Sequence, residues 1–221
     1  MAIILNIDSS GEKATVSIAE DGKIFGTMSN DVQKEHATFL HCAINELIRK
    51  TGIGFKALDA VAVTEGPGSY TGLRVGMATA KGLSFALNIP FITIGTLPAM
   101  LQAYVYEKEL SNGLFMPMID ARRMEVFTAV YESNLEEIVS PCAMILNDTS
   151  FENFFAGRQI FLFGSGAEKC KGLSTDARTH FDLLPDLAKS LCFIANEKYK
   201  IKEFSTLSNS QPLYIKEFFN G

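Results

Sequence analysis

The sequence has no excess of basic residues. Its 221 residues include 20 Lys and Arg against 25 Asp and Glu, which gives a formal net charge of −5. Binding to a nucleic-acid backbone relies on clustered Lys and Arg side chains, so this balance disfavours tight, unaided binding to RNA or DNA. A role on RNA is therefore expected to need a partner protein.

Closely spaced cysteines and long apolar runs are also missing. The cysteines lack the paired spacing of zinc or thioredoxin-like motifs, since they stand at Cys42, Cys142, Cys170 and Cys192. Free thiols in a reducing compartment are expected. No apolar run approaches the roughly 18 residues that cross a bilayer. The opening MAIILNIDSS meets a charge at Asp8, which predicts a strand and not a signal peptide. We expect a cytoplasmic protein without membrane contact.

What the sequence does contain is a series of apolar segments with strand and helix spacing. Hydrophobic residues make up 47% and charged residues 20% of the chain, which is typical of a soluble globular protein. The expected elements of the first half are strands over 2–8, 13–20 and 23–29, a helix over 35–50, a strand over 59–66, a helix over 73–87, a strand over 89–95 and a helix after Thr96. This order predicts an α/β layer fold.

The second half repeats the opening pattern of three apolar strands. In both halves the first of these strands ends in Ile-Asp, with Asp8 and Asp120 as the last residues. Duplication of a domain and chance similarity are the two explanations. The most polar connector near mid-chain places a domain boundary between an N-terminal βββαβαβα domain, residues 1–105, and a smaller C-terminal α/β domain, residues 106–221.

A glycine-rich turn, EGPGSYTGLRVG at 65–76, lies between a predicted strand and a predicted helix. A P-loop needs a lysine where Leu73 follows Gly72, and a dinucleotide fingerprint needs glycine in place of Thr71. Neither motif is present. The turn either serves tight packing alone or offers backbone N–H groups to an anion. Its motif residues are Gly66, Gly68, Ser69, Tyr70, Thr71 and Arg74.

The segment VTEGPGSYTGLRVGMATAKGLSFA, with ILNIDSS, IDARRMEVFTAVY and PLYIKE elsewhere, resembles the TsaB family, also called YeaZ. The resemblance covers nearly the whole chain. It implies the ribonuclease H-like fold of actin, heat-shock chaperones and sugar kinases, with duplicated domains of which the second is reduced. It also implies a non-catalytic subunit that binds and activates TsaD, the enzyme that transfers threonylcarbamoyl to the adenosine beside a tRNA anticodon. The ATPase TsaE and a second copy of the chain are further implied partners, and tRNA is implied only through the complex.

The same resemblance bears on nucleotide binding. In that superfamily two strand-turn-strand hairpins grip ATP phosphates and metal, and Asp8 and Asp120 stand at the matching carboxylates. The second turn carries Arg122 and Arg123 where close approach of a phosphate needs small residues. We therefore expect no catalytic residue, no metal and no tightly bound cofactor, with weak or interface-shared ATP or ADP at most. The alternative for both aspartates is a carboxylate that stabilises its own turn.

Two alternative functions remain. A stand-alone ATPase or kinase is favoured by the paired Asp hairpins and opposed by the two arginines. A metal-dependent glycoprotease, the activity once ascribed to the TsaD relatives, would need two histidines four residues apart. His36 and His41 are five apart, which separates them by about 140° around a helix and prevents them from sharing a metal.

The first two helices are expected to bind the partner, because the helix over 73–87 is apolar nearly all round and one sheet covers only one side. Burial wholly within the fold is the alternative. A row of small residues on this helix, Gly72, Gly76 and Ala80, is expected to face the partner. The Gly76→Leu variant would then keep a melting temperature near that of the wild type but lose homodimerisation and capture of TsaD. The predicted interface residues are His36, Phe39, Leu40, Ala43, Leu47, Gly72, Leu73, Gly76, Met77 and Ala80.

Overall fold

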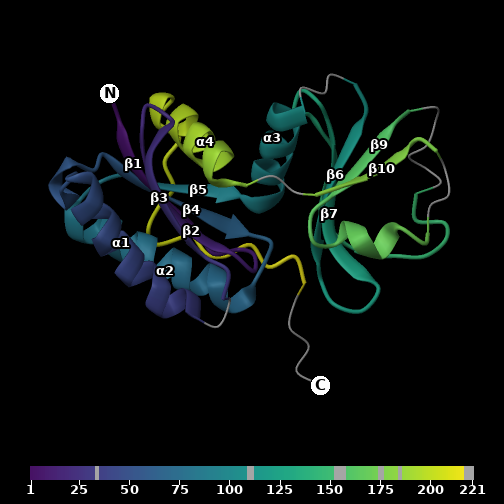
Figure 1. Cartoon of the computed structure of the whole chain (residues 1–221), viewed down its shortest axis with the longest axis horizontal. Helices are drawn as coiled ribbons and strands as arrows, with labels where there is room; N and C mark the ends of the chain where they lie inside the picture. The colour runs from purple at the N-terminus through teal and green to yellow at the C-terminus, as the bar shows by residue number, and fades with distance from the viewer. Residues whose placement is uncertain (33–34, 109–111, 152–157, 174–176, 184–185, 217–221) are drawn as a thin grey trace. The chain divides into compact units, whose positions relative to one another are not determined.

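Two five-stranded sheets organise the chain, one in each of two units (Figure 1). The computed structural model describes residues 1–32, 35–108, 112–151, 158–173, 177–183 and 186–216. Unit 1 comprises Met1–Thr96 and Leu187–Leu213, and unit 2 comprises Leu97–Asp186 and Tyr214–Gly221. This division differs from the predicted boundary at 105, because that position lies inside a helix and because a later helix returns to unit 1.

Unit 1 is a mixed sheet between helices. Its elements are β1 Ile3–Asp8, β2 Ala14–Glu20, β3 Lys23–Asn30, α1 His36–Thr51, the short 3-10 helix η2 Phe55–Ala57, β4 Ala60–Gly66, α2 Tyr70–Leu87, β5 Phe91–Gly95 and α4 Ala188–Lys200. The strand order is β3-β2-β1-β4-β5. The strands β1, β2 and β3 pair antiparallel, whereas β4 and β5 run parallel to β1. Helices α1 and α2 cover one face and α4 the other (Figure 1).

Burial explains the strand patterns of unit 1. Strands β1 and β2 are buried along nearly all their length, whereas the edge strand β3 alternates between exposed and half-buried residues. The half-buried side of β3 faces α1, since a Cβ built on Gly26 would lie 2.9 Å from side-chain atoms of Leu47 and Thr51. The core of unit 1 is the layer between this face of the sheet and the two helices. It contains Leu5, Ile7, Val16, Ile18, Leu40, Ile44, Leu47, Val61, Val63, Met77 and Ala80.

Unit 2 repeats the architecture with fewer helices. Its elements are α3 Thr96–Lys108, whose first residue belongs to unit 1, β6 Leu114–Asp120, β7 Glu125–Glu132, β8 Glu137–Ile145, β9 Ile160–Phe163, the 3-10 helix η4 Ala167–Cys170 and β10 Thr179–Asp182. On one face of the sheet, Met116 and Met118 pack with Cys170. On the other, the ring of Tyr104 from α3 stacks on Phe163 with centroids 4.0 Å apart.

The two sheets share one topology. Unit 2 has the strand order β10-β9-β6-β7-β8, which is the order of unit 1 read from the other edge. In each sheet an antiparallel meander comes first and two parallel strands follow on the far side of its first strand. The duplicated α/β fold expected from the Ile-Asp repeat is therefore present. Among the described residues, no helix has the length and apolarity needed to cross a membrane.

The row of small residues on α2 faces the chain's own sheet. Gly72, Gly76 and Ala80 are all buried. A Cβ built on Gly76 would lie 2.3 Å from Oγ of Ser9 and 3.5 Å from Cγ2 of Val63. The expectation that this row meets a partner helix was wrong, because the close approach that small residues permit is used to bring α2 onto β1 and β4.

Two glycines of the same helix give a matched test of this packing. Gly76→Ala should destabilise the chain by roughly 1 to 3 kcal/mol, because its Cβ has no room beside Ser9, and Gly76→Leu should cost at least as much. Gly82→Ala should instead stabilise it by about 0.5 to 1 kcal/mol, because Gly82 is exposed and its Cβ would meet nothing within 4 Å. Thermal and urea unfolding of the three variants measures the difference. A Gly76→Ala protein as stable as wild type would show that α2 does not pack as described.

Candidate functional site

Asp8 lies where the turn after β1 meets β4. The residue is 6% exposed. Its Oδ1 accepts hydrogen bonds from the backbone N–H of Ser10 at 3.0 Å, from the Ser10 hydroxyl at 2.7 Å and from the Thr64 hydroxyl at 2.9 Å. A carboxylate taken out of water needs such donors. In this arrangement Asp8 joins its own turn to β4 with neutral donors.

The glycine turn packs backbone to backbone on the β1–β2 turn. A Cβ on Gly68 would lie 2.3 Å from the carbonyl oxygen of Ser10, and one on Gly72 would lie 2.0 Å from that of Ser9. The backbone N–H of Ser69 donates to the Ser10 carbonyl at 2.7 Å, and the Ser9 hydroxyl donates to the Gly72 carbonyl at 2.8 Å. Only glycine fits at these positions. Close approach of two turns accounts for the glycines.

The start of α2 uses its own N–H groups. Ser69 is the N-cap, and its hydroxyl accepts from the N–H of Gly72 at 3.3 Å. The N–H of Leu73 donates to the Ser69 carbonyl at 2.8 Å. This cap begins the helix three residues before the predicted start. Three N–H groups at this helix start, those of Ser69, Gly72 and Leu73, are therefore hydrogen-bonded within the chain.

The remaining motif residues lie at other places around the turn. The guanidinium of Arg74 lies over the ring of Tyr70, 3.9 Å from its centroid. Arg74 and Thr71 are exposed. Gly66 has φ +118°, and its Cβ would lie 2.9 Å from the carbonyl oxygen of Leu213, so the C-terminal segment of unit 1 covers it.

Asp120 in unit 2 has a different environment from Asp8. Its Oδ1 accepts hydrogen bonds from Nζ of Lys169 at 2.7 Å and from the backbone N–H of Arg122 at 2.6 Å. Burial by itself raises the pKa of Asp120, but the hydrogen bonds from Lys169 and Arg122 outweigh it and leave the pKa below its usual value. The ammonium group of Lys169 thus occupies one side of Oδ1 of Asp120. A metal bound to a nucleotide would have to approach this carboxylate from another side.

Lys169 comes from the second glycine turn, GSGAEK at 164–169. A Cβ on Gly164 would lie 2.4 Å from the carbonyl oxygen of Met118, and the N–H of Gly166 donates to the same oxygen at 3.0 Å. This turn therefore packs on β6. Nζ of Lys169 also donates to the carbonyl of Glu125 at 3.0 Å, which joins the turn to both strands of the β6–β7 hairpin.

The surroundings of His36, His41, Cys170 and Cys192 are defined in the structure. Nε2 of His36 lies 2.9 Å from the carbonyl oxygen of Glu12, which ties the start of α1 to the β1–β2 turn, whereas His41 is exposed. The described residues contain no cluster of three side chains able to hold a metal ion. Burial raises the pKa of Cys170 to about 11 and of Cys192 to about 12, so both thiols are protonated at neutral pH.

The predicted interface residues are placed inside unit 1. Phe39 is half-buried, and the others are buried: His36, Leu40, Ala43, Leu47, Gly72, Leu73, Gly76, Met77 and Ala80. Buried side chains position the helices but do not touch another protein. Periodicity alone could not choose the outer side of α2, because the helix is apolar on both sides.

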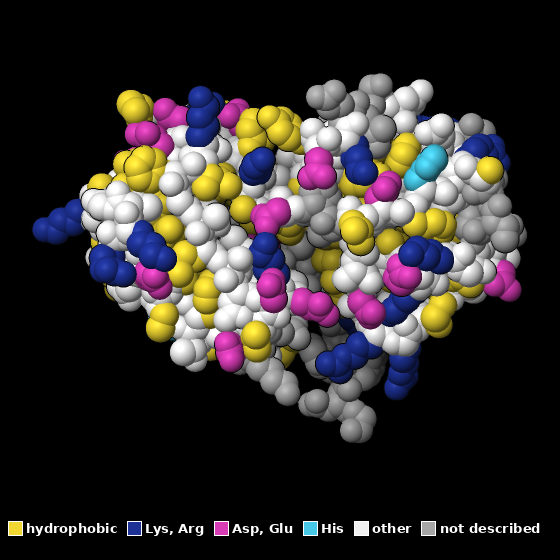
Figure 2. All heavy atoms as spheres, in the orientation of Figure 1, with side chains coloured by type: hydrophobic (Ala, Val, Ile, Leu, Met, Phe, Trp, Pro, Cys, Tyr) yellow, Lys and Arg dark blue, Asp and Glu magenta, His cyan; other side chains and the backbone are white. Residues whose placement is uncertain are grey.

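The opposite side of α2 is exposed, and the sequence prediction did not include it in the interface. We call it the outer face of α2, and its exposed residues are Thr71, Arg74, Ala78, Gly82, Phe85 and Ala86. At about 100° per residue these positions fall within one arc of about 120°. The side chain of Phe85 is 79% exposed, and Arg74 is the one charged residue of the face. Hydrophobic side chains reach the surface over α1 and α2 in Figure 2.

Comparison with known proteins agrees with this fold. The family model that describes TsaD, tRNA N6-adenosine threonylcarbamoyltransferase, matches residues 12–202. The TsaB protein of tRNA threonylcarbamoyladenosine biosynthesis from Haemophilus influenzae is 36% identical over 125 residues, 56% of this chain and 51% of that protein. The chain thus spans about half the length of this relative.

Solved structures extend the similarity in fold. YeaZ from Pseudomonas aeruginosa superposes with a TM-score of 0.78 at 23% identity, covering 97% of this chain and 100% of that one. An inorganic polyphosphate/ATP-glucomannokinase from Arthrobacter has a TM-score of 0.53 at 12% identity, with 90% of this chain and 100% of that chain covered. The duplicated topology is therefore the actin-like and sugar-kinase-like fold, and the chain belongs to the TsaD family of proteins and, within it, to the TsaB (YeaZ) family of tRNA threonylcarbamoyladenosine biosynthesis.

Proposed function

We propose that this chain is a non-catalytic subunit that binds TsaD through the outer face of α2 and thereby activates threonylcarbamoyl transfer to tRNA. The observation that carries the proposal is the composition of this face, where Ala78, Gly82, Phe85 and Ala86 are exposed together without an acidic neighbour on the helix. Exposed apolar surfaces of this kind are typical of protein interfaces.

The construction of unit 1 supports this choice of face. The inner side of α2 is fixed on β1 and β4, so the outer face is presented on a rigid element. Gly82 leaves space, since nothing lies within 4 Å of its Cβ position, and a partner helix can approach closely there. Helix α1 packs beside α2 and adds charged residues at its end, Arg49 and Lys50. An apolar centre with a charged rim is the usual anatomy of an interface.

We expect TsaD and a second copy of the chain to bind the same outer face of α2. A second copy of the chain would compete with TsaD for it, so the homodimer and the TsaD complex exclude each other. TsaE then joins the complex, and tRNA is bound tightly only within the complex. Such a role places the protein in the cytoplasm, where tRNA is modified. Any ATP or ADP would bind weakly or be shared at an interface.

The environments of the two aspartates support a non-catalytic role. Oδ1 of Asp8 accepts three hydrogen bonds from the chain itself, and Oδ1 of Asp120 is paired with Lys169. In each carboxylate Oδ1 already has partners within the chain, which disfavours its use in holding a metal on a nucleotide. The alternative function, a stand-alone ATPase or kinase, is favoured by the kinase-like fold and opposed by this pairing.

ATP turnover tests that alternative. We expect the purified chain to hydrolyse ATP no faster than a buffer control containing Mg²⁺, because Oδ1 of both aspartates is hydrogen-bonded within the chain. Asp8→Asn is expected to leave this background unchanged. Robust phosphate release by the wild-type chain that disappears in Asp8→Asn would contradict the proposed function and favour the kinase-like alternative.

A charged, bulky side chain on the outer face should block TsaD. Gly82→Arg is expected to fold normally, because its side chain extends into open space, and to weaken capture of TsaD at least tenfold, about 1.4 kcal/mol. Pull-down and calorimetric titration with TsaD from the same organism measure this effect. The homodimer should weaken in parallel.

Gly172→Arg is the matched control for this variant. Gly172 is exposed in unit 2 and also has nothing within 4 Å of its Cβ position. The Gly172→Arg variant should capture TsaD with wild-type affinity. Normal capture by Gly82→Arg, with a melting temperature equal to wild type, would show that TsaD binds elsewhere.

A further inference from the structure

The β6–β7 hairpin ends in two consecutive arginines with left-handed backbone. Arg122 has φ 68° and Arg123 has φ 50°. Residues such as Asn-Gly are usual where two neighbouring residues need positive φ, because other side chains are strained there. Both arginines are exposed. The geometry of the turn therefore does not explain why arginine occupies either position.

The acidic groups beside this turn already have other cationic partners. Asp120 pairs with Lys169 at 2.7 Å, and Glu125 pairs with Lys216 at 2.6 Å. These pairs leave the two arginines as excess positive charge at the tip, in a chain whose formal net charge is −5. Lys and Arg side chains project at the lower edge of unit 2 in Figure 2.

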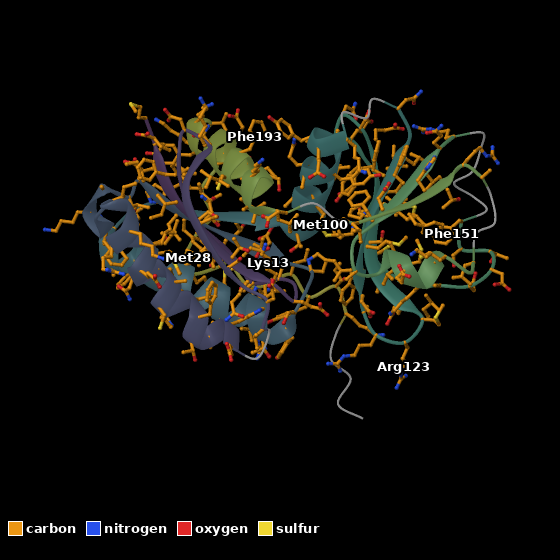
Figure 3. All side chains as sticks on the ribbon, viewed as in Figure 1. Lys13, Met28, Met100, Arg123, Phe151 and Phe193 are labelled. Atoms are coloured by element: carbon orange, nitrogen blue, oxygen red, sulfur yellow. The ribbon has the colours of Figure 1, made fainter. Side chains whose placement is uncertain are left out.

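The hairpin that carries the arginines is held firmly. The N–H of Ala121 donates to the Glu125 carbonyl at 3.1 Å, and that of Leu146 on the β8 side donates to the Met124 carbonyl at 2.8 Å. The N–H of Asp120 donates to the Ser165 hydroxyl at 3.1 Å. Figure 3 shows Arg123 at the tip, pointing away from the ribbon. A rigid frame lowers the entropic cost of binding a ligand at the tip.

We propose that Arg122 and Arg123 bind the phosphodiester backbone of the tRNA that the complex modifies. Guanidinium groups present planar, forked donors that match phosphate oxygens and remain charged at all relevant pH values. Two such contacts add affinity without giving an acidic chain strong RNA binding by itself. The identity of the RNA rests on the proposed function, whereas the affinity of the tip for RNA phosphates does not.

The double variant Arg122→Asn/Arg123→Gly separates this role from a structural one. It should melt at or above the wild-type temperature, because Asn-Gly suits the turn. At low salt the full chain should bind tRNA weakly, and the variant about tenfold more weakly still. The slope of log K against log salt should fall in magnitude by about 1.4 to 1.8, as expected for two lost phosphate contacts. Filter binding or fluorescence anisotropy over a salt series measures both quantities.

Two further variants serve as controls. Arg122→Lys/Arg123→Lys keeps the charge and should retain the salt slope while losing part of the affinity, because the forked donors are gone. Lys23→Gln/Lys56→Gln removes the same charge from two exposed positions of unit 1 outside the outer face of α2 and should leave tRNA binding near wild type.

Three results would overturn the proposal. They are wild-type tRNA affinity in Arg122→Asn/Arg123→Gly with every protein partner retained, no salt-dependent tRNA binding by the wild-type chain at low salt, and wild-type tRNA affinity in that variant with loss of a protein partner. The last result would assign the tip to an acidic protein surface. Capture of TsaD is measured separately, so its absence would refute the proposed function and leave the RNA result standing.

Discussion

The close approach of the β1–β2 turn to the glycine turn is the constraint on which unit 1 depends. The carbonyls of Ser9 and Ser10 occupy the space that side chains at Gly72 and Gly68 would fill, and Asp8 anchors the same turn to β4 through Thr64. Because this contact fixes one side of α2 on the sheet, it also determines which residues α2 presents to solvent. The exposed outer face of α2, which we propose as the partner-binding surface, is thus set by backbone packing on the opposite side of the helix.

The two units satisfy equivalent aspartates by different means. Both strands end in Ile-Asp in sheets of the same topology, yet Asp8 is buried among hydroxyl donors, whereas Asp120 is paired with the ammonium of Lys169. Neutral donors keep the first turn closed and integral to the fold. The lysine joins the second glycine turn to the β6–β7 hairpin, next to the two exposed arginines. A duplicated fold therefore presents a helix with an exposed apolar face in one unit and a cationic hairpin in the other.

The sequence predicted the elements with strong periodicity and missed those set by tertiary contacts. Strands β1 to β5 and the first three helices follow alternating or helical patterns, so most of their boundaries are within a few residues of the prediction. Helix α4 was not predicted, and its return to unit 1 depends on packing that a linear pattern does not reveal. The side of α2 was assigned wrongly because apolar residues line both sides. The pairing of Asp120 with Lys169 joins residues 49 positions apart, a distance that local spacing cannot report.

Hydrogen–deuterium exchange of the chain, alone, with TsaD and with TsaD plus tRNA, tests the central claim most directly. Addition of TsaD should slow exchange in α2 and in the adjoining part of α1 while leaving the β6–β7 hairpin unchanged. Addition of tRNA should then slow exchange at the hairpin. Protection by TsaD that spares α2 would contradict the assignment of its outer face as the site where the partner binds.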